Sequence, residues 1–493
     1  MLAVIGFNSV PAAVLGELES AGRLPRLAHL RREATEVTLA TPARSFPAGV
    51  FPTSWSGIPL RDHGIHYPFM WDAAGQRVRY LDSFPSPTML WDRVSEAGGR
   101  VLVVDPYEGG PSNAAGLTVS GWQFANRVVL RPASCPSGAY REWQRRLTPA
   151  RRAEEVFGQP SERTLRQLAR TLVAAPQRVA DLVTAALPEV SPDLLVADFP
   201  SVHLAGHQLW DPASVVPGIA PESVSELRNA LHEIVVEADT ALGRIIDALP
   251  VGSDIVVFSP LGMDADTSRG DVFGPMLAAV LDSATLTGAS VGGSWRLRAA
   301  IPTSLRARVA SALPDSVAVA LASRLELRGT DWSQTRAFAV PSDTSGLIRF
   351  NVIGRERDGI VAPGDTAALA AEIASGLSSF VFEDGSPVVA AIDVVADSFG
   401  GGEGSGLLPD LVVHWSSVPT RRGEVLHSPT FGTIRRDGAG SGRSGNHTAD
   451  AWALVAATSG RAQRQTGDVV DIAATALSRF GLTSAGATLI EPM

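Results

Sequence analysis

Residues 193–210 read DLLVADFPSVHLAGHQLW, an apolar run followed at once by two histidines. The run at 193–199 is typical of a strand that is buried on both faces, and such strands form parallel sheets covered by helices. His203 and His207 lie four residues apart beyond the end of this strand, where open α/β sheets bind their ligands. The spacing alone does not separate two metal ligands from two unrelated histidines. A metal site requires a third ligand from elsewhere in the chain.

Similar apolar runs recur along the chain and alternate with amphipathic segments. This order predicts an α/β fold with a central, mostly parallel sheet and helices on both faces. We expect one domain over residues 1–493, with helical and loop insertions near 112–190 and 270–345. The other predicted strands are 2–7, 100–106, 254–260, 410–415 and 451–458. The predicted helices are 86–98 (capped by Ser86 and stopped by Gly98), 222–249 and 365–380.

The composition argues against several classes of partner and site. Of the 493 residues 45% are hydrophobic, the formal net charge is −9, and all 42 basic residues are arginine. The arginines form no patch that would neutralise phosphates, so we expect neither a nucleic acid nor an anionic membrane as partner. The single cysteine, Cys135, excludes an intramolecular disulfide and a cysteine-based zinc cage.

The segment MLAVIGFNSV carries no basic residues ahead of its short apolar run, so it predicts a first strand and not a signal peptide. No stretch of the sequence reaches the roughly 20 apolar residues that span a bilayer. We therefore expect a cytoplasmic protein.

Seven parts of the chain, taken in order, resemble the type I phosphodiesterase / nucleotide pyrophosphatase family of the alkaline phosphatase superfamily. Their order along nearly the whole chain is more specific than any one of them. The resemblance implies an alkaline-phosphatase-like fold and a metal-dependent hydrolase. The parts are VIGFNSV (4–10), SGIPLRDHGIH (56–66), GGRVLVVDP (98–106) with GLTVSGW (116–122), DLLVADFPSVHLAGHQLW (193–210), VVEADTALGRIIDAL (235–249) with DIVVFSPLGM (254–263), LIRFNVIGRERDGIVAPGD (347–365), and PDLVVHW (409–415) with GRSGNHTADAWALVA (442–456).

In that family two zinc ions share the site. The resemblance implies a complete set of ligands on this chain for the first ion and an incomplete set for the second. The ligands of the first ion correspond to His203, His207 and His447. The protein ligands of the second ion correspond to Asn8, Pro260, Leu261 and the nucleophile. Proline and leucine side chains cannot bind a cation, so the resemblance implies one zinc ion. Three neutral imidazoles with an open fourth position are a donor set found in catalytic zinc sites.

The hydroxyl nucleophile of the family corresponds to a position within SFPAGVFPTS (45–54). One alignment places it on Ser45 and another on Val50, while Thr53 is a further hydroxyl nearby. Without a second ion to ionise a hydroxyl, a covalent route through Ser45 or Thr53 is disfavoured.

Asp198, His63 and His66 each have a functional and a structural interpretation. Asp198 either orients a ligand imidazole or caps the end of the strand. His63 and His66 match a family position that closes a helix, which favours a packing role for both.

Asp264 and Asp266 follow the positions of the lost second metal site. They are candidates for a general base or for substitute metal ligands, although loop aspartates also cap helices. Arg349 and Arg355, together with Asn8, are the candidates for binding an anionic substrate. The two arginines fit a structural ion pair with a residue such as Glu356 equally well.

These residues support two functions of different classes. In the first, zinc lowers the pKa of a bound water to about 7, so that hydroxide attacks an ester or phosphoester of a small anionic molecule directly. A zinc-assisted transfer or elimination fits the same site. In the second, the lost metal site marks a degenerate relative that serves as a binding or scaffolding protein. Because histidine at position 203 is itself a zinc ligand, the first site keeps its ability to bind metal, which favours the enzyme.

Overall fold

A nine-stranded sheet forms the centre of the larger of two lobes. Its spatial order is β23 (Thr466–Asp468), β2 (Thr35–Ala40), β21 (Trp452–Ala456), β11 (Asp254–Ser259), β1 (Leu2–Gly6), β10 (Leu194–Asp198), β5 (Val101–Val104), β6 (Gly116–Ser120) and β8 (Ala133–Cys135). The strands from β11 to β6 run parallel to one another. Every residue of β1, β5 and β10 is buried, which accounts for their continuous apolar sequences.

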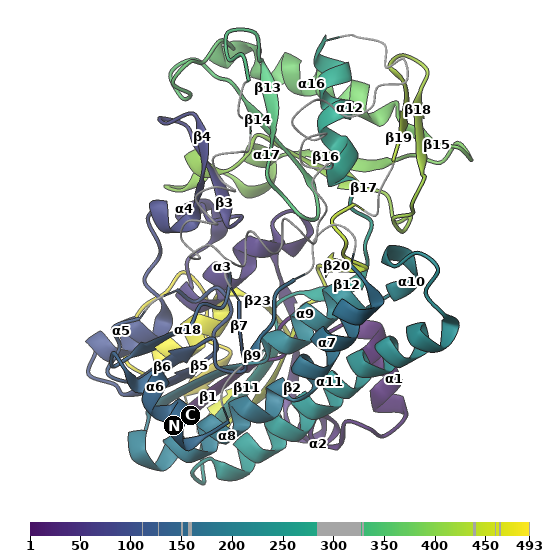
Figure 1. The fold of residues 1–493 in the computed structure, drawn as a ribbon. Coiled ribbons are helices and arrows are strands. Elements are labelled where there is room, and N and C mark those ends of the chain that lie inside the picture. The colour runs from purple at the N-terminus through teal and green to yellow at the C-terminus, as the bar shows by residue number, and fades with distance from the viewer. Residues whose placement is uncertain are drawn as a thin grey trace.

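Helices cover both faces of this sheet, as Figure 1 shows. Side chains alternate across β1, so Ala3 and Ile5 face one hydrophobic core while Leu2 and Val4 face the other. The first core contains side chains of α1 (Ala12–Ser20), α2 (Pro25–Glu33), α7 (Glu162–Val173), α8 (Ala175–Val190), α9 (Pro200–Leu209) and α11 (Pro221–Ala248). The second contains those of α3 (Val50–Ser56), α5 (Leu90–Glu96) and α18 (Val470–Ser478). The predicted α/β layering is confirmed.

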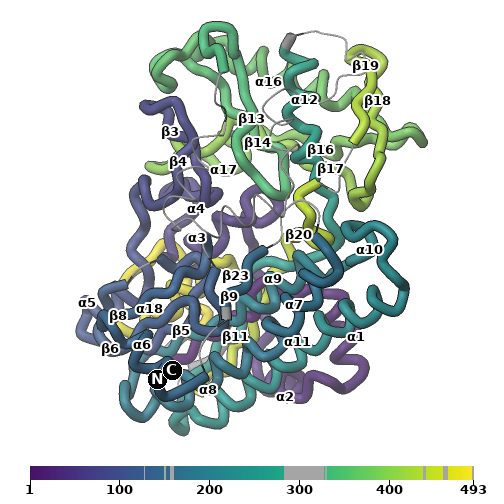
Figure 2. Tube along the Cα trace, viewed as in Figure 1, coloured from purple at the N-terminus to yellow at the C-terminus, as the bar shows by residue number. Residues whose placement is uncertain are grey.

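A second, smaller lobe lies above the central sheet in Figure 1. Its core is an antiparallel sheet in the order β13 (Ala337–Val340), β14 (Gly346–Phe350), β17 (Leu411–Trp415) and β16 (Val389–Val394). Packed around it are α12 (Gly270–Asp282), α16 (Thr366–Ser378), β15 (Val381–Phe382), β18 (Val425–Ser428) and β19 (Gly432–Arg435). Figure 2 shows that the early hairpin of β3 (Phe69–Asp72) and β4 (Arg77–Tyr80) joins this lobe, beside β13 and β14.

The structure is a computed structural model, and it describes the chain except residues 111, 127, 149–150, 156–159, 283–326, 328–329, 437–439, 459, 463–464 and 493. The remaining helices and strands are α4 (Leu60–His63), α6 (Ala139–Arg146), α10 (Pro212–Val215), α17 (Val395–Phe399), β7 (Phe124–Ala125), β9 (Arg151–Arg152), β12 (Gly262–Ala265), β20 (Gly445–Thr448), β22 (Gly460–Ala462) and β24 (Ile490–Pro492). No described helix is long and apolar enough to cross a membrane.

Three predicted elements differ from the observed ones. The segment 451–458 contains β21, which pairs antiparallel with β11, and 410–415 contains β17 of the smaller lobe. Burial on both faces produces a continuous apolar run whatever the strand direction, so the pattern could not reveal this difference. The helix predicted over 86–98 with Ser86 as its cap is shorter in the structure, where it runs from Leu90 to Glu96.

The two segments expected as insertions contribute to both lobes. Within 112–190, β6 and β8 extend the central sheet, and α7 and α8 cover one of its faces. Within 270–345, α12 and β13 belong to the smaller lobe, and residues 283–326 lie outside the described residues.

Candidate metal centre

His203 and His207 lie on α9, which begins directly after the buried strand β10. Pro200 occupies the first turn of this helix, where its missing N–H needs no partner. Residues four apart project from the same face of a helix, so the two imidazoles point in the same direction. Both side chains are buried.

His447 comes from β20, which pairs antiparallel with β12 so that His447 lies opposite Met263. β20 also lies directly against α9, where the Ser444 N–H donates to the carbonyl of His207 at 2.8 Å. A Cβ at Gly445 would collide with the carbonyl oxygen of Gly206. Glycine at 445 therefore permits the approach that brings His447 to the other two histidines.

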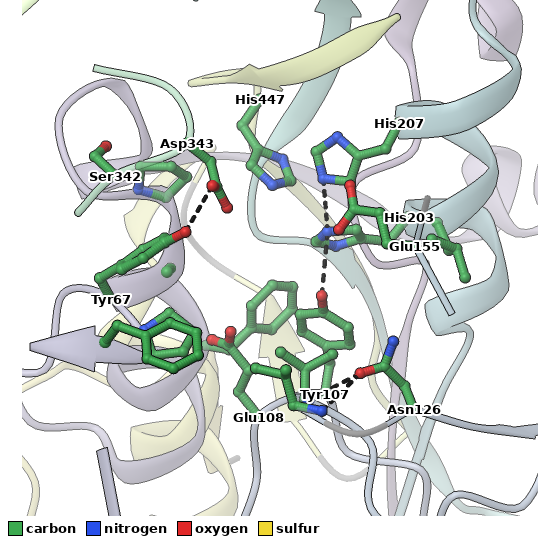
Figure 3. Close-up of a pocket in the computed structure, with 18 of the residues that line it drawn as sticks. Tyr67, Tyr107, Glu108, Asn126, Glu155, His203, His207, Ser342, Asp343 and His447 are labelled. Carbon is green, nitrogen blue, oxygen red and sulfur yellow. Dashed lines mark hydrogen bonds between the residues drawn. The ribbon is translucent and has the colours of Figure 1, made fainter. Parts of the chain in front are cut away.

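The three imidazoles form a nearly equilateral triangle (Figure 3). The ring centroids of His203 and His207 are 4.7 Å apart, those of His203 and His447 4.7 Å, and those of His207 and His447 4.6 Å. One nitrogen from each ring lies within 4.8 Å of the other two. Zinc–nitrogen bonds of about 2.1 Å hold ligand nitrogens roughly 3.5 Å apart. The structure thus brings the three predicted ligands together on the scale of a metal ion.

Hydrogen bonds on the far side of two rings determine their tautomers. His207 Nδ1 is 2.8 Å from the carbonyl oxygen of Gly445 and must donate to it. His203 Nδ1 donates to Asn8 Oδ1 at 2.8 Å. The two Nε2 atoms, 3.0 Å apart, therefore both carry lone pairs that face each other. Such a contact is repulsive unless a cation or a proton lies between the nitrogens.

Burial disfavours a proton between the two Nε2 atoms, because the imidazolium that would result is positively charged. It is the main cause that lowers the pKa of His203 and of His207 well below 6.5, and the positive charge of Arg443 contributes to both shifts. Burial, followed by Arg443, lowers the pKa of His447 to about 3. Neutral imidazole is the form that binds metal. The three imidazoles are thus held in the neutral form, and one nitrogen from each lies within reach of the same point, so the residues fit a bound cation.

Asn8 and Asp198 lie behind His203. Asn8 Nδ2 donates to Asp198 Oδ2 at 2.8 Å, which fixes the amide so that its oxygen faces the imidazole. Asp198 also accepts from the backbone N–H groups of Tyr107 and Phe199, while burial raises its pKa to about 8. A Cβ at Gly6 would collide with this carboxylate.

Both interpretations of Asp198 keep a geometric basis, since it accepts from backbone N–H groups at the strand end and is linked through Asn8 to the His203 imidazole. Asn8 itself is fully buried and does not line the cavity beside the histidines. Its contacts are with Asp198 and His203 and not with the cavity, where a substrate contact was expected.

A cavity of about 150 Å³ opens onto the three histidines (Figure 3). Tyr107 lines the cavity beside His203, with its hydroxyl 3.3 Å from His203 Nε2 and its ring centroid 4.5 Å from that of the imidazole. The aromatic lining residues are Phe46, Phe51, Tyr67, Phe69, Tyr107 and Phe124, and the charged ones are Glu108, Glu154, Glu155, Asp343 and Arg443.

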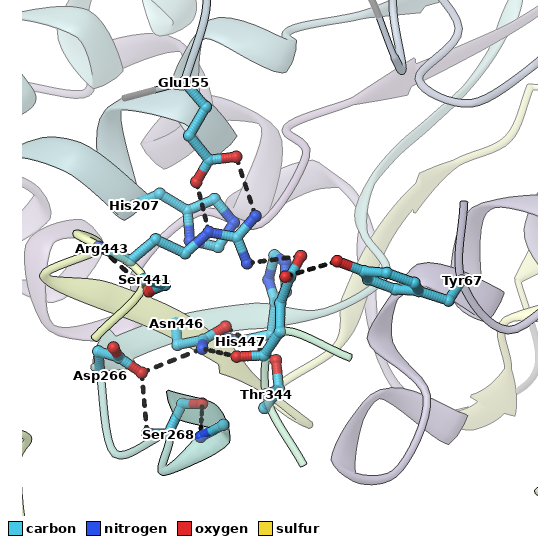
Figure 4. A network of polar contacts seen from close by, with 12 residues as sticks. Tyr67, Glu155, His207, Asp266, Ser268, Thr344, Ser441, Arg443, Asn446 and His447 are labelled. Carbon is cyan, nitrogen blue, oxygen red and sulfur yellow. Dashed lines mark hydrogen bonds and ion pairs between the residues drawn. The ribbon is translucent and has the colours of Figure 1, made fainter. Parts of the chain in front are cut away.

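Arg443 is the centre of a polar network that borders the cavity (Figure 4). It forms ion pairs with Glu155 and, at 3.0 Å, with Asp343. Tyr67 donates its hydroxyl proton to Asp343 at 2.6 Å. Asn446, next to His447, donates to Asp266 Oδ1 at 3.1 Å. These contacts hold the loop before β20 in place.

Two predicted groups of residues lie elsewhere. Arg349 and Arg355 both bind Glu356 inside the smaller lobe, and Arg355 also binds Asp410. Their charges are neutralised there and neither arginine lines the cavity. The two arginines therefore form the ion pairs that were the alternative to binding an anionic substrate.

Asp264 and Asp266 do not line the cavity either. Asp264 is exposed and accepts from the N–H of Ala265. Asp266 is buried, and its Oδ1 accepts from Ser268 N and Asn446 Nδ2. It supports β20, and the structure offers no place for it as a general base.

The three nucleophile candidates have different surroundings. Ser45 lines the cavity, and Val50 is buried in a hydrophobic core. The Thr53 hydroxyl donates to the carbonyl of Gly49 and accepts from His63 Nε2, since His63 Nδ1 accepts from the N–H of Ile65. Thr53 and His63 thus brace the end of α3.

His66, expected to pack, both packs against Phe46 and lines the cavity. Tyr107 and Glu108, which the sequence analysis did not single out, follow the strand at 100–106. The rule that ligands bind at the carboxyl ends of parallel strands pointed to them as it did to His203. Arg443 lies in the Gly/Ser-rich loop just before His447, and that closeness was a usable signal. Asp343 had none.

Solved structures share the fold. Phosphonoacetate hydrolase from Sinorhizobium meliloti 1021 in complex with phosphonoacetate superposes with a TM-score of 0.50 at 13% identity, covering 97% of this chain and 95% of that one. Inactive murine ectonucleotide pyrophosphatase / phosphodiesterase 5 in complex with AMP gives a TM-score of 0.47 at 10% identity, with coverage of 99% and 96%. No curated protein matches the sequence significantly.

The fold is therefore alkaline-phosphatase-like, as the sequence implied. A family model also matches the sequence itself. It is the model of type I phosphodiesterase / nucleotide pyrophosphatase. It covers residues 2–339, which include β1 and α9 with His203 and His207, and His447 lies beyond them. Because the match extends over more than half of the chain, the protein belongs to the type I phosphodiesterase / nucleotide pyrophosphatase family.

Proposed function

We propose that the chain is a hydrolase that uses one zinc ion, held by His203, His207 and His447, to cleave an ester or phosphoester of a small molecule. The convergence of three imidazoles, two of them buried and with their Nε2 lone pairs 3.0 Å apart, carries this proposal. Membership of a phosphodiesterase family supports the phosphoester as the reacting group. The donor set is that of catalytic zinc, which keeps a fourth position for water or substrate.

A zinc ion bound there would supply a Lewis acid and lower the pKa of a bound water to about 7. The chain's residues prepare the site for it. Asn8 and the Gly445 carbonyl hold His203 and His207 with their Nε2 lone pairs directed inward. Tyr107 keeps its proton, because burial raises its pKa well above 10, and its hydroxyl is placed beside His203 Nε2 to donate a hydrogen bond to a reacting oxygen.

The surroundings of the second-ion positions support a single ion. Leu261 is buried in a hydrophobic core, and the Asn8 amide is already shared between Asp198 and His203. In the described part of the chain, the three histidines are the one group of metal-donor side chains close enough to hold an ion.

The geometry also favours direct attack by water over a covalent intermediate. The Thr53 hydroxyl already donates one hydrogen bond, to Gly49, and accepts another, from His63. Ser45 has no second metal ion beside it that would lower the pKa of its hydroxyl. Ser45→Ala and Thr53→Ala are therefore expected to retain most of the rate on a reconstituted enzyme. Mass spectrometry after acid quench checks this, since a phosphoseryl or phosphothreonyl residue within 45–54 would establish the two-step route instead.

The function is tested by stripping the protein with a chelator and restoring zinc. Turnover of bis(4-nitrophenyl) phosphate and of 4-nitrophenyl carboxylic esters should vanish and return with the metal. His207→Ala should lose both metal and turnover, while His29→Ala, on the exposed surface of α2, should keep both. Zinc bound at the three histidines without turnover of any ester would support the binding or scaffolding function.

A further inference from the structure

Asn8 and Ser9 form a tight turn directly after the end of β1, and both have a left-handed backbone. Their φ angles are 40° and 64°, in the region that favours glycine. Asparagine tolerates this conformation better than serine does, so the strain falls mainly on Ser9. Both residues are fully buried. A strained residue of this kind persists only where the surrounding structure holds it.

The turn is held at both of its ends by β11. The N–H of Phe7 donates to the carbonyl of Phe258 at 2.8 Å, and the N–H of Val10 donates to the Ser259 hydroxyl at 3.2 Å. The two residues between these contacts cannot return to a negative φ without disturbing them. The fold therefore maintains the strained conformation of Ser9 and does not let it relax.

This turn brings two successive side chains to the same nitrogen of a ligand histidine. In an extended strand, neighbouring side chains point to opposite faces. Here Asn8 Oδ1 lies 2.8 Å and Ser9 Oγ 3.1 Å from His203 Nδ1. Because Nδ1 donates its hydrogen to the Asn8 oxygen, the Ser9 oxygen is a second acceptor for the same N–H, in a three-centre hydrogen bond.

We propose that Ser9 is a positioning residue of the metal centre, and that its left-handed backbone serves to place this second acceptor on His203. Two acceptors on Nδ1 fix both the tautomer and the orientation of the ring, so that Nε2 faces the other two histidines. The backbone of Ser9 lowers the stability of the fold, while its side chain raises the affinity for metal. This inference rests on the metal site of the proposed function and not on its reaction.

Two substitutions separate these contributions. Ser9→Ala removes the hydroxyl and keeps a Cβ at the left-handed position, whereas Ser9→Gly removes both. Competition with a zinc-binding dye should show that each variant binds zinc about two- to tenfold more weakly than the parent protein, the size expected for one neutral hydrogen bond. In urea denaturation of the metal-free protein, Ser9→Gly should have the higher midpoint of the two, because glycine is not strained there.

Ser191 is the matched control. It is a serine with a φ of 47° at the exposed end of α8. Ser191→Gly should likewise have a higher urea midpoint than Ser191→Ala, but both variants should keep the parental zinc affinity.

A double substitution tests whether Asn8 and Ser9 share one N–H. Each acceptor partly replaces the other when one is lost, and the N–H is left without either when both are lost. Asn8→Ala combined with Ser9→Ala should therefore weaken zinc binding by more than the product of the two single effects. A purely structural role for Ser9 would produce no such coupling in the affinity for metal.

The outcomes separate the inference from the proposed function. Parental zinc affinity in Ser9→Ala would overturn the role of the hydroxyl and retain the site of three histidines. A midpoint for Ser9→Gly no higher than that of Ser9→Ala, or independent effects at Asn8 and Ser9, would also overturn the inference. The expected losses of zinc affinity in a protein that hydrolyses no ester would support the inference and count against the hydrolase.

Discussion

His203, His207 and His447 are held in three different ways. His203 is held by a side-chain amide, His207 by a backbone carbonyl, and His447 by the strand that carries it. The Asn8 amide can be removed by a substitution, because it belongs to a side chain. The Gly445 carbonyl belongs to the backbone, so a substitution at 445 does not remove it. Asn8 is therefore a residue through which the site can be weakened without removing a ligand.

Asn8→Ala should lower zinc affinity by about 10- to 100-fold, as is usual when a group that orients a ligand histidine is lost. The tautomer of His203 would no longer be fixed, and Asp198 would lose a hydrogen-bond donor. Competition with a zinc-binding dye measures the affinity. Asn229→Ala, at an exposed position on α11, is the matched control, and equal affinities for the two variants would contradict the role of Asn8.

His63 and His66 determine part of the pH dependence of stability. Burial is the main cause that lowers the pKa of each to about 4, against an ordinary value of about 6.5. The unfolded chain binds more protons between these values, so stability that is present above pH 6.5 is lost as the pH falls towards 4. The full loss is about 3 kcal/mol for each histidine.

Urea denaturation of the metal-free protein at pH 7 and pH 5 checks this. The midpoint should fall at pH 5, and His66→Phe should reduce the fall, since phenylalanine does not titrate and retains the ring contact with Phe46. An unchanged difference between the two pH values in the variant would show that His66 is not involved.

At the scale of elements, β10 was predicted from sequence, while α9 and β20 were not. The run at 193–199 is long and apolar, which identified the strand; the helix after it was not among the predicted helices. GNHT at 445–448 carries no apolar pattern, and only the resemblance to a family connected His447 with α9. Arg349 and Arg355 show a further limit, because a sequence displays a charge and not its partner. Their partners Glu356 and Asp410 became visible only in the folded lobe.

Gly445→Ala tests the contact between β20 and α9. The added methyl group meets the Gly206 carbonyl, so β20 must move away and carry His447 with it. Zinc affinity should fall while the far-ultraviolet circular dichroism spectrum stays near that of the parent protein. Gly16→Ala, where an added Cβ meets nothing, is the control and should leave zinc affinity unchanged. A Gly445→Ala variant with parental zinc affinity would refute the importance of this contact.

At the scale of the whole molecule, the cavity is shared between the lobes. Ser342, Asp343 and Leu347 of the smaller lobe line it together with the histidines of the larger one. The positions that would have held a second ion lie in the larger lobe, at the ends of β1 and β11, where Asn8, Pro260 and Leu261 stand.

Plasma emission analysis of the purified protein should accordingly find about one zinc per chain. Two equivalents would direct attention to carboxylates of the cavity, with Glu108 first, since Asp264 and Asp266 do not reach it. His447→Ala should reduce the content to nearly zero, because two histidines alone are a poor zinc site.

The long separation of α9 and β20 along the chain also affects how the protein is made. As the ribosome delivers the sequence, His203 and His207 leave the exit tunnel long before His447, and β21, which follows β20, is needed to complete the central sheet. A nascent chain presents two zinc donors and cannot close the site. Metal uptake should therefore wait until residue 447 has left the tunnel, so that a chain cut short before that residue remains metal-free.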